Sequence, residues 1–305
     1  MSQRDAPISI VVATRDRPVM LRDCLDSLAA SLGPRDEVLV VDSCSRERDT
    51  GEVARRAGAR LVRAPVPGAS LARNLGWRSA AWPVVAFVDD DVRVTLGWAD
   101  ALRATFAAHP ETSFVTGRLG LRPEDSDAER PVAHFAPDRG FVVDASLADD
   151  LGHGANLAVR RAALARVGGY DEQLGPGTRW HAAEDLELID RLLAAGCTGL
   201  HEPSAAAVHV QWRGRRDLLR LEWRYGLGQG ARLGRLRRLD PGRFAAVRRI
   251  VWHVQGWQAL GRSLRQGHEF ETLSTVLRLA GTAFGQLGAA AVTGRRHAAR
   301  ETSRS

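Results

Sequence analysis

The chain has 305 residues, 44% of them hydrophobic and 26% charged, which is the composition of a globular protein of one or two domains. It excludes collagenous, low-complexity and multi-span membrane chains. The formal net charge is +7, and every basic side chain is an arginine because the sequence has no lysine. The absence of lysine excludes a Walker-A phosphate loop and lysine Schiff-base chemistry. The positive charge allows an anionic partner, namely nucleotide phosphate, acidic lipid or nucleic acid, without choosing among them.

The cysteines indicate a reducing compartment. Cys24, Cys44 and Cys197 are odd in number and have no C-x-x-C spacing, which argues against a disulfide framework and a zinc ribbon. The first residues carry no secretion-signal pattern and run directly into a strand-like stretch. We therefore expect a cytoplasmic chain.

The first two-thirds of the sequence alternate strand and helix patterns. Apolar runs predict strands at 8–13, 38–41, 61–62 and 84–88, and helical spacing predicts helices at 18–32, 49–57 and 70–82. Such alternation predicts a mostly parallel sheet with helices on both faces and a ligand site at the carboxyl ends of the strands. Residues 124–150 have no clear period and are expected to form a long excursion, followed by helices at 160–167 and 184–195.

The character of the sequence changes at about residue 211. Residues 212–249 are rich in arginine with interleaved aromatic residues, which predicts basic amphipathic helices. Residues 273–292 are mildly apolar but contain Arg278 and Gln286, so an interfacial or partner-packed helix is favoured over a membrane span. The Gly281-x-x-x-Gly285 spacing is too common to decide between them. We expect a first domain over 1–210 and a helical C-terminal extension over 211–305.

Three acids directly follow the predicted strand at 84–88. Asp89, Asp90 and Asp91 repel one another unless a cation neutralises them, and hard oxygen ligands select Mg²⁺ or Mn²⁺. Such ions use one or two carboxylates together with substrate phosphates, so a nucleotide diphosphate is the expected ligand. The alternative is an acidic turn that caps the following helix.

Other polar residues follow the earlier strands. Asp42 has the position of an acid that binds a ribose or a base edge, or it is simply a turn-former before Ser43. Arg15 and Arg73 have guanidinium forks that suit phosphate, although single arginines carry little weight in so arginine-rich a chain.

Two further candidates lie in the second half of the sequence. Glu184 and Asp185 open a predicted helix after a glycine-rich loop, where a carboxylate either accepts a proton from an attacking hydroxyl or stabilises the helix dipole. His209 follows an apolar run and is either a metal ligand or a buried, satisfied histidine.

The order of these motifs resembles glycosyltransferase family 2. The motifs are Val11-Val12-Ala13-Thr14-Arg15-Asp16-Arg17-Pro18, Val40-Val41-Asp42-Ser43, Ala72-Arg73-Asn74-Leu75-Gly76, Phe87-Val88-Asp89-Asp90-Asp91, Gly154-Ala155-Asn156-Leu157-Ala158 with Gly168-Gly169-Tyr170-Asp171-Glu172, and Ala183-Glu184-Asp185-Leu186-Glu187-Leu188. The resemblance covers about 7–209, and its specificity lies in the order of six motifs. It implies an α/β, Rossmann-like GT-A fold (a nucleotide-diphospho-sugar transferase fold) with a helical C-terminal extension.

The resemblance also implies a role for each matching residue. Asp185 would be the catalytic base, and Asp91 with His209 would hold Mg²⁺ or Mn²⁺. The donor side would comprise Thr14, Arg15, Asp16, Asp42, Arg73, Asn74, Asp89 and Asp90. The acceptor side would comprise Asn156, Trp180 and Glu184.

The implied reaction is an inverting transfer of one hexose or deoxyhexose from a UDP-, dTDP- or GDP-linked donor to a hydroxyl acceptor. Because the large membrane module of processive synthases is absent, single addition is favoured over polymerisation. We expect a bacterial protein whose acceptor is a cell-envelope, lipid-linked or polysaccharide precursor. The tryptophan-interleaved tail predicts peripheral contact with the inner face of the membrane, with dimerisation or core packing as its alternatives.

The sequence also has features of other protein classes. Gly226-Leu227-Gly228-Gln229-Gly230-Ala231 formally fits the dinucleotide fingerprint, but it follows a helix-like segment instead of a strand. Nucleic-acid binding is not expected, because it leaves the acidic cluster unexplained. A zinc hydrolase is disfavoured because Ala205 stands where His201-Glu202 would need a second histidine. A metal-dependent nucleotidyltransferase and a non-catalytic protein that binds nucleotide sugars or anionic surfaces remain alternatives.

Overall fold

The computed structural model describes residues 6–46, 49–121, 135–148 and 151–302, with side chains described as far as residue 289. The chain divides into two compact units. The first contains Met1–Glu172 and Leu188–Trp212, and the second contains Gln173–Glu187 and Arg213–Ser305. Of the excursion expected over 124–150, residues 124–134 and 149–150 lie outside the described residues.

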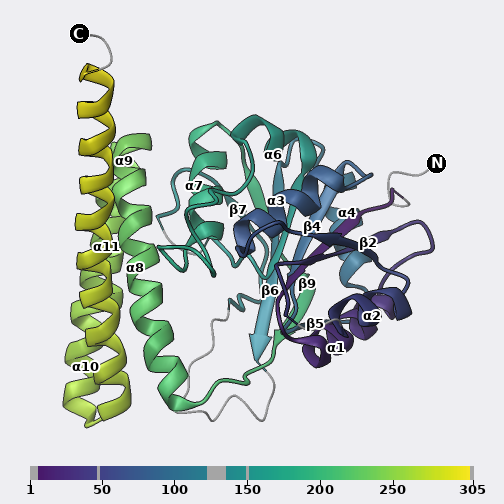
Figure 1. Cartoon of the computed structure of the whole chain (residues 1–305), viewed down its shortest axis with the longest axis horizontal. Coiled ribbons are helices and arrows are strands. Elements are labelled where there is room, and N and C mark those ends of the chain that lie inside the picture. Colours follow the sequence, from purple (N-terminus) through teal and green to yellow (C-terminus); the bar gives the residue numbers. More distant parts are fainter. Residues whose placement is uncertain (1–5, 47–48, 122–134, 149–150, 303–305) are drawn as a thin grey trace. The chain divides into compact units, whose positions relative to one another are not determined.

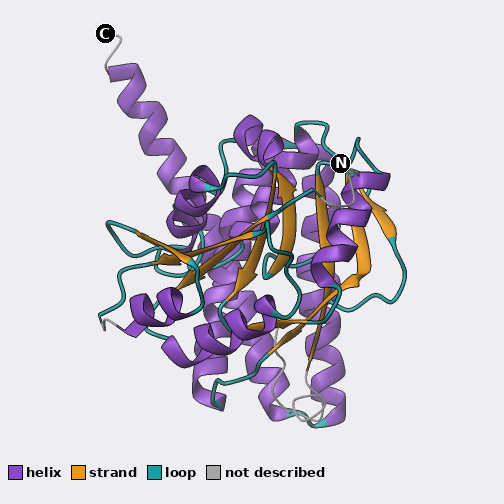
Figure 2. Ribbon diagram, turned by 90° about the vertical axis from the view of Figure 1, so that its right-hand side faces the viewer, coloured by secondary structure: helices purple, strands orange, loops and turns teal. Residues whose placement is uncertain are grey.

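The first unit is built on one sheet, whose strands run side by side in Figure 2. Along the sheet the strands lie in the order β3-β2-β1-β4-β8-β6-β9-β5, and β7 pairs with β9. The strands are β1 Ser9–Thr14, β2 Glu37–Asp42, β3 Arg60–Arg63, β4 Val84–Asp89, β5 Val92–Val94, β6 Phe114–Leu121, β7 Phe141–Val143, β8 Asn156–Arg160 and β9 Gly199–His209.

The sheet is mixed, which corrects the expectation of a mostly parallel one. β1 pairs in parallel with β2 and β4, and β2 with β3, as the alternating pattern predicts. Beyond β4 the direction changes: β8 is antiparallel to both β4 and β6, and β9 is antiparallel to β5 and β7 but parallel to β6. A reversed strand needs no crossover helix, so the helix-strand alternation of the sequence could not indicate it.

Helices cover both faces of the sheet, as expected. They are α1 Pro18–Ala29, α2 Asp49–Arg56, α3 Ala69–Ser79, α4 Trp98–Ala108, α6 Arg161–Val167 and α7 Glu184–Ala194, the last of which spans both units. Alternate residues of β1 point to opposite faces. Ile10 and Val12 share a core cluster with Trp98 of α4, whereas Val11 lies beneath Gly76 of α3.

The second unit is mainly helical, and its extended basic helices confirm the expected C-terminal extension. It contains α8 Arg215–Leu239, α9 Pro241–Arg249, a π-helical segment η2 Ile250–Gln258, α10 Ala259–Gln266 and α11 Glu269–Thr302. α8 and α11 run side by side over most of their length (Figure 1). Among the described residues, no helix is both long enough and apolar enough to span a bilayer.

Glycines bring α8 and α11 into backbone contact. A Cβ atom added at Gly226 would lie 2.2 Å from the carbonyl oxygen of Arg278, and one added at Gly230 would lie 2.2 Å from that of Thr282. From α11, a Cβ at Gly285 would lie 2.2 Å from the carbonyl oxygen of Leu227. Because the contacts advance by four residues on both helices, the helices are parallel.

The glycine motifs of the sequence therefore have a packing role. Gly226 and Gly230 belong to the formal dinucleotide fingerprint, but they lie inside a helix and contact another helix. Gly281 and Gly285 supply the facing side of the same contact. Small residues in this pattern allow two helix backbones to approach closely, in membranes and in water alike.

Candidate active site

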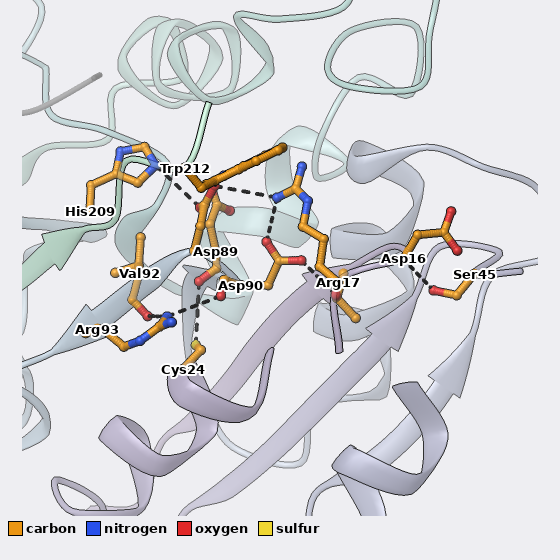
Figure 3. Close-up of polar contacts among 12 residues, drawn as sticks. Asp16, Arg17, Cys24, Ser45, Asp89, Asp90, Val92, Arg93, His209 and Trp212 are labelled. Carbon is orange, nitrogen blue, oxygen red and sulfur yellow. Dashed lines mark hydrogen bonds and ion pairs between the residues drawn. The ribbon is translucent and has the colours of Figure 1, made fainter. Parts of the chain in front are cut away.

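Three carboxylates gather where β4 ends and β5 begins, at the carboxyl edge of the parallel strands. Asp89 is the last residue of β4 and is paired in register with Ala13 of β1. Asp90 and Asp91 follow it and are each only 3% exposed. Figure 3 shows Asp89 and Asp90 together with Arg17, His209 and Trp212. Two buried acids in sequence require compensating partners, because isolated charges are costly to bury.

Asp90 is held from the start of the chain. The hydroxyl of Thr14 donates a hydrogen bond of 2.7 Å to one carboxylate oxygen, and Arg17 donates one of 2.8 Å to the other. Burial raises the pKa of Asp90 to about 6, even though the Arg17 charge acts in the opposite direction. The charges of Asp90 and Asp91 outweigh the burial of the Arg17 guanidinium and raise its pKa, so Arg17 stays protonated.

Asp91 is held mainly from the other end of the unit. The pairing of β5 with β9 sets Val92 opposite His209, and this places the His209 Nε2 atom 3.4 Å from Asp91 Oδ1. Trp212 donates its indole N–H to Asp91 Oδ2 at 2.9 Å. Burial alone would raise the pKa of Asp91, but the hydrogen bond and charge of His209 hold it below its usual range.

Arg17 and Trp212 are functional candidates that sequence reasoning missed. The Arg17 guanidinium also lies 3.5 Å from Asp91 and stacks 4.7 Å above the centre of the Trp212 ring (Figure 3). Arg17 lies within the motif from Val11 to Pro18, and Trp212 follows His209 by three residues. Their nearness to predicted site residues is the signal that could have pointed to both. Because Trp212 begins the arginine-rich segment, the sequence pattern assigns it to the C-terminal extension and gives no sign of its contact with Asp91.

The remaining acid of the cluster pairs with a buried arginine. Arg73, which is 6% exposed, donates a hydrogen bond of 2.7 Å to Asp89. Its guanidinium lies 5.5 Å from the ring centre of Tyr170, which in turn meets Phe87 edge to face. The structure thus brings together Arg73 and Asp89, both predicted for the donor side.

The loops after β1 and β2 carry the other donor-side candidates. Asp42 is fully buried; it accepts a hydrogen bond of 2.7 Å from the Ser45 amide and another of 3.1 Å from Arg63. The first contact is that of a turn-former, and the second is an ion pair at the edge of the sheet. Asp16 has a left-handed backbone (φ 55°) and donates its amide N–H to Ser45, which ties the two loops together. Arg15 lies beside it, with its Nε atom 3.6 Å from Asp16.

Two asparagines predicted to bind donor and acceptor have several contacts within the protein. Asn74 bonds to both backbone groups of Tyr170, to the Glu172 carboxylate and to the Trp77 indole. Asn156 accepts from the Trp98 indole and donates to two backbone carbonyls. Both are at most 2% exposed, and their amides bond to other groups of the protein in this structure.

The second unit contains Asp185, Glu184 and Trp180. Asp185 lies in the first turn of α7, where its Oδ1 accepts the Leu186 amide N–H at 2.8 Å. Glu184 is 7% exposed. Trp180 is 6% exposed and packs in a cluster with Leu174, Ala231 and Ala289.

Helices of the second unit support the segment that leads into Asp185. A Cβ atom at Gly228 of α8 would lie 2.4 Å from the Ala182 carbonyl oxygen, and one at Gly288 of α11 would lie 2.6 Å from the Trp180 ring. On either side of Ala182, His181 and Ala183 have left-handed backbones, at φ 57° and 66°. Such conformations are costly for residues with side chains and persist where the surroundings fix them.

Comparison with known proteins identifies the family. Residues 9–167, just over half of the chain, match the model described as glycosyl transferase family 2. The chain belongs to glycosyl transferase family 2. A relative named pre-mycofactocin glycosyltransferase, from Mycobacterium tuberculosis, is 29% identical over 237 residues, which are 74% of this chain and 47% of that protein. An uncharacterized glycosyltransferase of Haemophilus influenzae is 22% identical over 187 residues, 61% of this chain and 62% of that one. The chain thus spans about half to two-thirds of the length of these relatives.

Solved structures show that this family 2 chain has the GT-A fold. A mannosyltransferase from Pyrobaculum calidifontis, in complex with GDP-Man and Mn²⁺, superposes with a TM-score of 0.66 at 20% identity, covering 92% of this chain and 86% of that one. S. aureus TarS 1–349 in complex with UDP-GlcNAc gives 0.57 at 15% identity, covering 92% of both chains. The expected α/β GT-A fold with a helical C-terminal extension is therefore confirmed.

The residues of this family 2 chain suit a divalent ion that is completed by substrate. Among the described residues no set of three His, Cys, Asp or Glu side chains is placed to hold a metal. Asp91 and His209 nevertheless present an oxygen and a nitrogen 3.4 Å apart. Mg²⁺ and similar ions commonly take one or two protein ligands and fill their other positions with water and substrate phosphates. The carboxylate oxygen and imidazole nitrogen thus suit a divalent ion that binds together with a diphosphate.

Proposed function

We propose that the chain is an inverting glycosyltransferase that moves one sugar from a nucleotide-diphosphate donor to a hydroxyl acceptor. The carboxylate cluster of Asp89, Asp90 and Asp91, in a family 2 chain, carries this proposal. Burying two of these acids lowers the stability of the fold, whereas hydrophobic residues at the same positions would not. A cluster of buried acids with shifted pKa values typically marks a functional site. Their basic partners keep them charged where a cation and a diphosphate can bind.

The donor side of the proposal uses the ends of β1, β2 and β4. Asp42 and Asp16 would contact the base and ribose, and Thr14, Arg15 and Arg73 would line the path to the diphosphate. A donor of this class is supported by the structural neighbours in complex with GDP-Man and UDP-GlcNAc. The nucleotide of this chain is proposed to be UDP, dTDP or GDP.

Asp91 and His209 would hold Mg²⁺ or Mn²⁺. The neighbour in complex with Mn²⁺ supports a divalent ion of this kind. When bound, the ion neutralises the charge that develops on the departing diphosphate. Arg17 already supplies one positive charge at Asp90 and Asp91, so the site would not depend on the ion alone to keep these acids ionised.

The proposed chemistry is a single in-line displacement. The acceptor oxygen bonds to the anomeric carbon as the bond from that carbon to the diphosphate oxygen breaks, and the electron pair of that bond leaves with the nucleoside diphosphate. Asp185 takes the proton of the acceptor hydroxyl, while Glu184 orients the acceptor. The N-terminus of α7 favours a charged carboxylate at Asp185, which keeps it in the form that accepts a proton. The attack inverts the configuration of the sugar.

The acceptor is proposed to be a cell-envelope, lipid-linked or polysaccharide precursor. The name of the Mycobacterium tuberculosis relative adds pre-mycofactocin to the acceptors worth testing. Cys24, Cys44 and Cys197 are free thiols, which suits the cytoplasmic side of the membrane. A homodimer formed through the C-terminal helices is the alternative to membrane contact.

The experiment combines donor binding with turnover. Wild type, Asp91→Asn and Asp185→Asn are screened by thermal shift against UDP-, dTDP- and GDP-sugars with and without Mn²⁺. A donor at one hundred times its Kd should stabilise the fold by about 2.7 kcal/mol. We expect a metal-dependent shift in wild type, its loss in Asp91→Asn, and its retention in Asp185→Asn. Asp217→Asn, at an exposed ion pair with Arg220, is the control.

Turnover distinguishes the remaining functions. With acceptor, Asp185→Asn should lose about 10²–10⁴-fold in kcat, the usual contribution of a general base. Release of nucleoside diphosphate with an inverted product supports glycosyl transfer. Pyrophosphate release would instead indicate a nucleotidyltransferase, and donor binding without turnover on any acceptor would indicate a binding protein. Wild-type turnover in Asp185→Asn would exclude it as the base.

A further inference from the structure

One side of α11 carries exposed apolar residues, of which Phe284 contacts Trp223 of α8 with 5.5 Å between the ring centres. Leu273, Val276, Phe284 and Leu287 are 46%, 44%, 63% and 72% exposed. With Ala280 between them they recur at intervals of three and four residues, so they form one stripe along the helix. At 1.5 Å per residue this stripe is about 21 Å long. The glycines of α11 that contact α8 lie about a third of a turn around the helix from this stripe.

The stripe continues onto α10. A hollow of about 320 Å³ lies between α10 and the first turns of α11, and its lining includes Leu264, Leu273 and Val276. Leu264 is 61% exposed. α10 lies beside this part of α11 in Figure 1, so the apolar surface extends from one helix to the other.

The π-helical segment η2, which packs on α11, has an exposed tryptophan of its own. Gly256 of η2 is buried against Leu279, where an added Cβ would lie 2.5 Å from that side chain. Its neighbours Val254 and Trp257 are instead 42% and 58% exposed. A π-helix has a wider turn than an α-helix, and such segments are rare outside functional sites. We call the seven residues Val254, Trp257, Leu264, Leu273, Val276, Phe284 and Leu287 the apolar face.

Arginines outnumber acids beside the apolar face, where the acids are Glu269 and Glu271 in the first turn of α11. Residues 241–268 contain five arginines and no aspartate or glutamate. Four of them are exposed, namely Arg248, Arg249, Arg262 and Arg265. Within the described part of the chain none of these four is paired with a carboxylate. The segment therefore offers exposed positive charge beside exposed tryptophan and leucine.

We propose that the apolar face lies on the surface of an anionic bilayer, with the four arginines on lipid phosphates. Interfacial helices combine tryptophan, phenylalanine and leucine on one side with arginine at its border, as here. Each arginine near an anionic surface adds attraction, and lipid phosphates supply the anions that this segment lacks. A second copy of the chain fits less well, because its exposed acids beside the hollow are Glu269 and Glu271, and Glu271 is already paired with His268. The binding needs neither donor nor acceptor, so it is independent of the proposed reaction.

Vesicle co-sedimentation of the full chain tests this inference, using phosphatidylcholine with and without phosphatidylglycerol. We expect wild type to bind vesicles that contain phosphatidylglycerol, with a blue shift of tryptophan emission. Replacing Arg248, Arg249, Arg262 and Arg265 by glutamine should weaken binding at least tenfold, since each charge is worth severalfold. Trp257→Gln with Leu264→Gln should weaken it about tenfold and abolish the blue shift.

Matched controls separate the apolar face from net charge. Arg22, Arg55, Arg56 and Arg166 are exposed elsewhere, and their replacement by glutamine removes the same charge. Leu96→Gln replaces an exposed leucine that is outside the face. Circular dichroism melts confirm that each variant folds. Equal weakening by the control arginines, or no vesicle binding by folded wild type, overturns the inference. A stable dimer that variants of the apolar face disrupt, without vesicle binding, assigns the face to a second copy.

Discussion

The carboxylate cluster of the first unit and the α8–α11 contact of the second unit use opposite means to fix geometry. In the first, Asp90 and Asp91 are buried and held by Arg17, Thr14, Trp212 and His209. In the second, the absence of side chains at glycines lets two helix backbones touch. The buried carboxylates lower the stability of the fold but can take part in chemistry, whereas the glycine contact is mainly structural.

The comparison shows that the role of a sequence motif depends on the helix or strand in which it lies. Gly226-x-Gly228-x-x-Ala231 has the spacing of a phosphate-binding turn, but on a helix its glycines contact other backbone. Asp89-Asp90-Asp91 has the composition of a surface turn, but at the end of β4 two of the acids are almost fully buried.

The largest effect is expected at the helix contact. Gly230→Leu places a branched side chain where a Cβ would already lie 2.2 Å from the Thr282 carbonyl oxygen, and backbone cannot yield as a flexible side chain can. We expect the free energy of unfolding of the second unit to fall by about 4 kcal/mol or more, or the chain to become insoluble. Thermal and urea unfolding measure this.

Gly214→Ala is the matched control for this change. Gly214 precedes α8 at φ −77° with nothing within 4 Å of an added Cβ. Its melting temperature should stay close to that of wild type. If Gly230→Leu behaves in the same way, α8 and α11 do not pack as the structure shows.

A smaller loss is expected within the first unit, at Asn74. Its amide bonds to both backbone groups of Tyr170 and to the Trp77 indole, all buried. Asn74→Ala leaves these groups without a partner, which should lower the free energy of unfolding by about 2–4 kcal/mol. Urea unfolding measures the loss, and Ser146→Ala, at an exposed turn, provides the baseline.

Donor affinity should distinguish a structural role of Asn74 from a role in donor binding. If Asn74 only holds Tyr170 and Glu172 in place, the Kd for donor measured well below the melting temperature should change little. A large loss of donor affinity in a variant that remains folded would support the predicted donor-side role.

Sequence reasoning reached the first half of the fold because its signals are local. The apolar runs of β1, β2 and β4 and the helical spacing of α1 and α3 each appear within a dozen residues, and their bounds agree with the structure to within three residues. β5 has three residues and β8 five, and both join the sheet by antiparallel pairing with distant partners. Nothing in such short segments indicates the strand they will meet.

The same limit applied to the site. Asp89, Asp90 and Asp91 were found because they are adjacent in the sequence and follow a strand. Arg17 is 73 residues from Asp90, and Trp212 is 121 residues from Asp91, so no spacing connects them. Asp185 was assigned by family resemblance, and its role stays a prediction.

The smallest expected effect concerns the ionisation of Asp90, whose pKa burial raises to about 6. In the unfolded chain this pKa is about 3.9, so ionisation costs the folded state stability. That cost is absent below about pH 4, grows between about pH 4 and 6, and is complete above that range. Asp90→Asn keeps an oxygen that can accept from Thr14 but cannot ionise.

The melting temperature of Asp90→Asn relative to wild type, without divalent ions, should therefore rise as the pH increases from about 4 to 6 and then level off. The expected gain is a few degrees at most, because Arg17 loses a charged partner in the same change. Asp100→Asn, whose carboxylate is 80% exposed beside Arg103, should show no such rise. A flat difference for Asp90→Asn would mean that Arg17 compensates fully for the burial of this acid. The carboxylate cluster would then be as neutral in stability as a surface turn, and its contrast with the helix contact would rest on function alone.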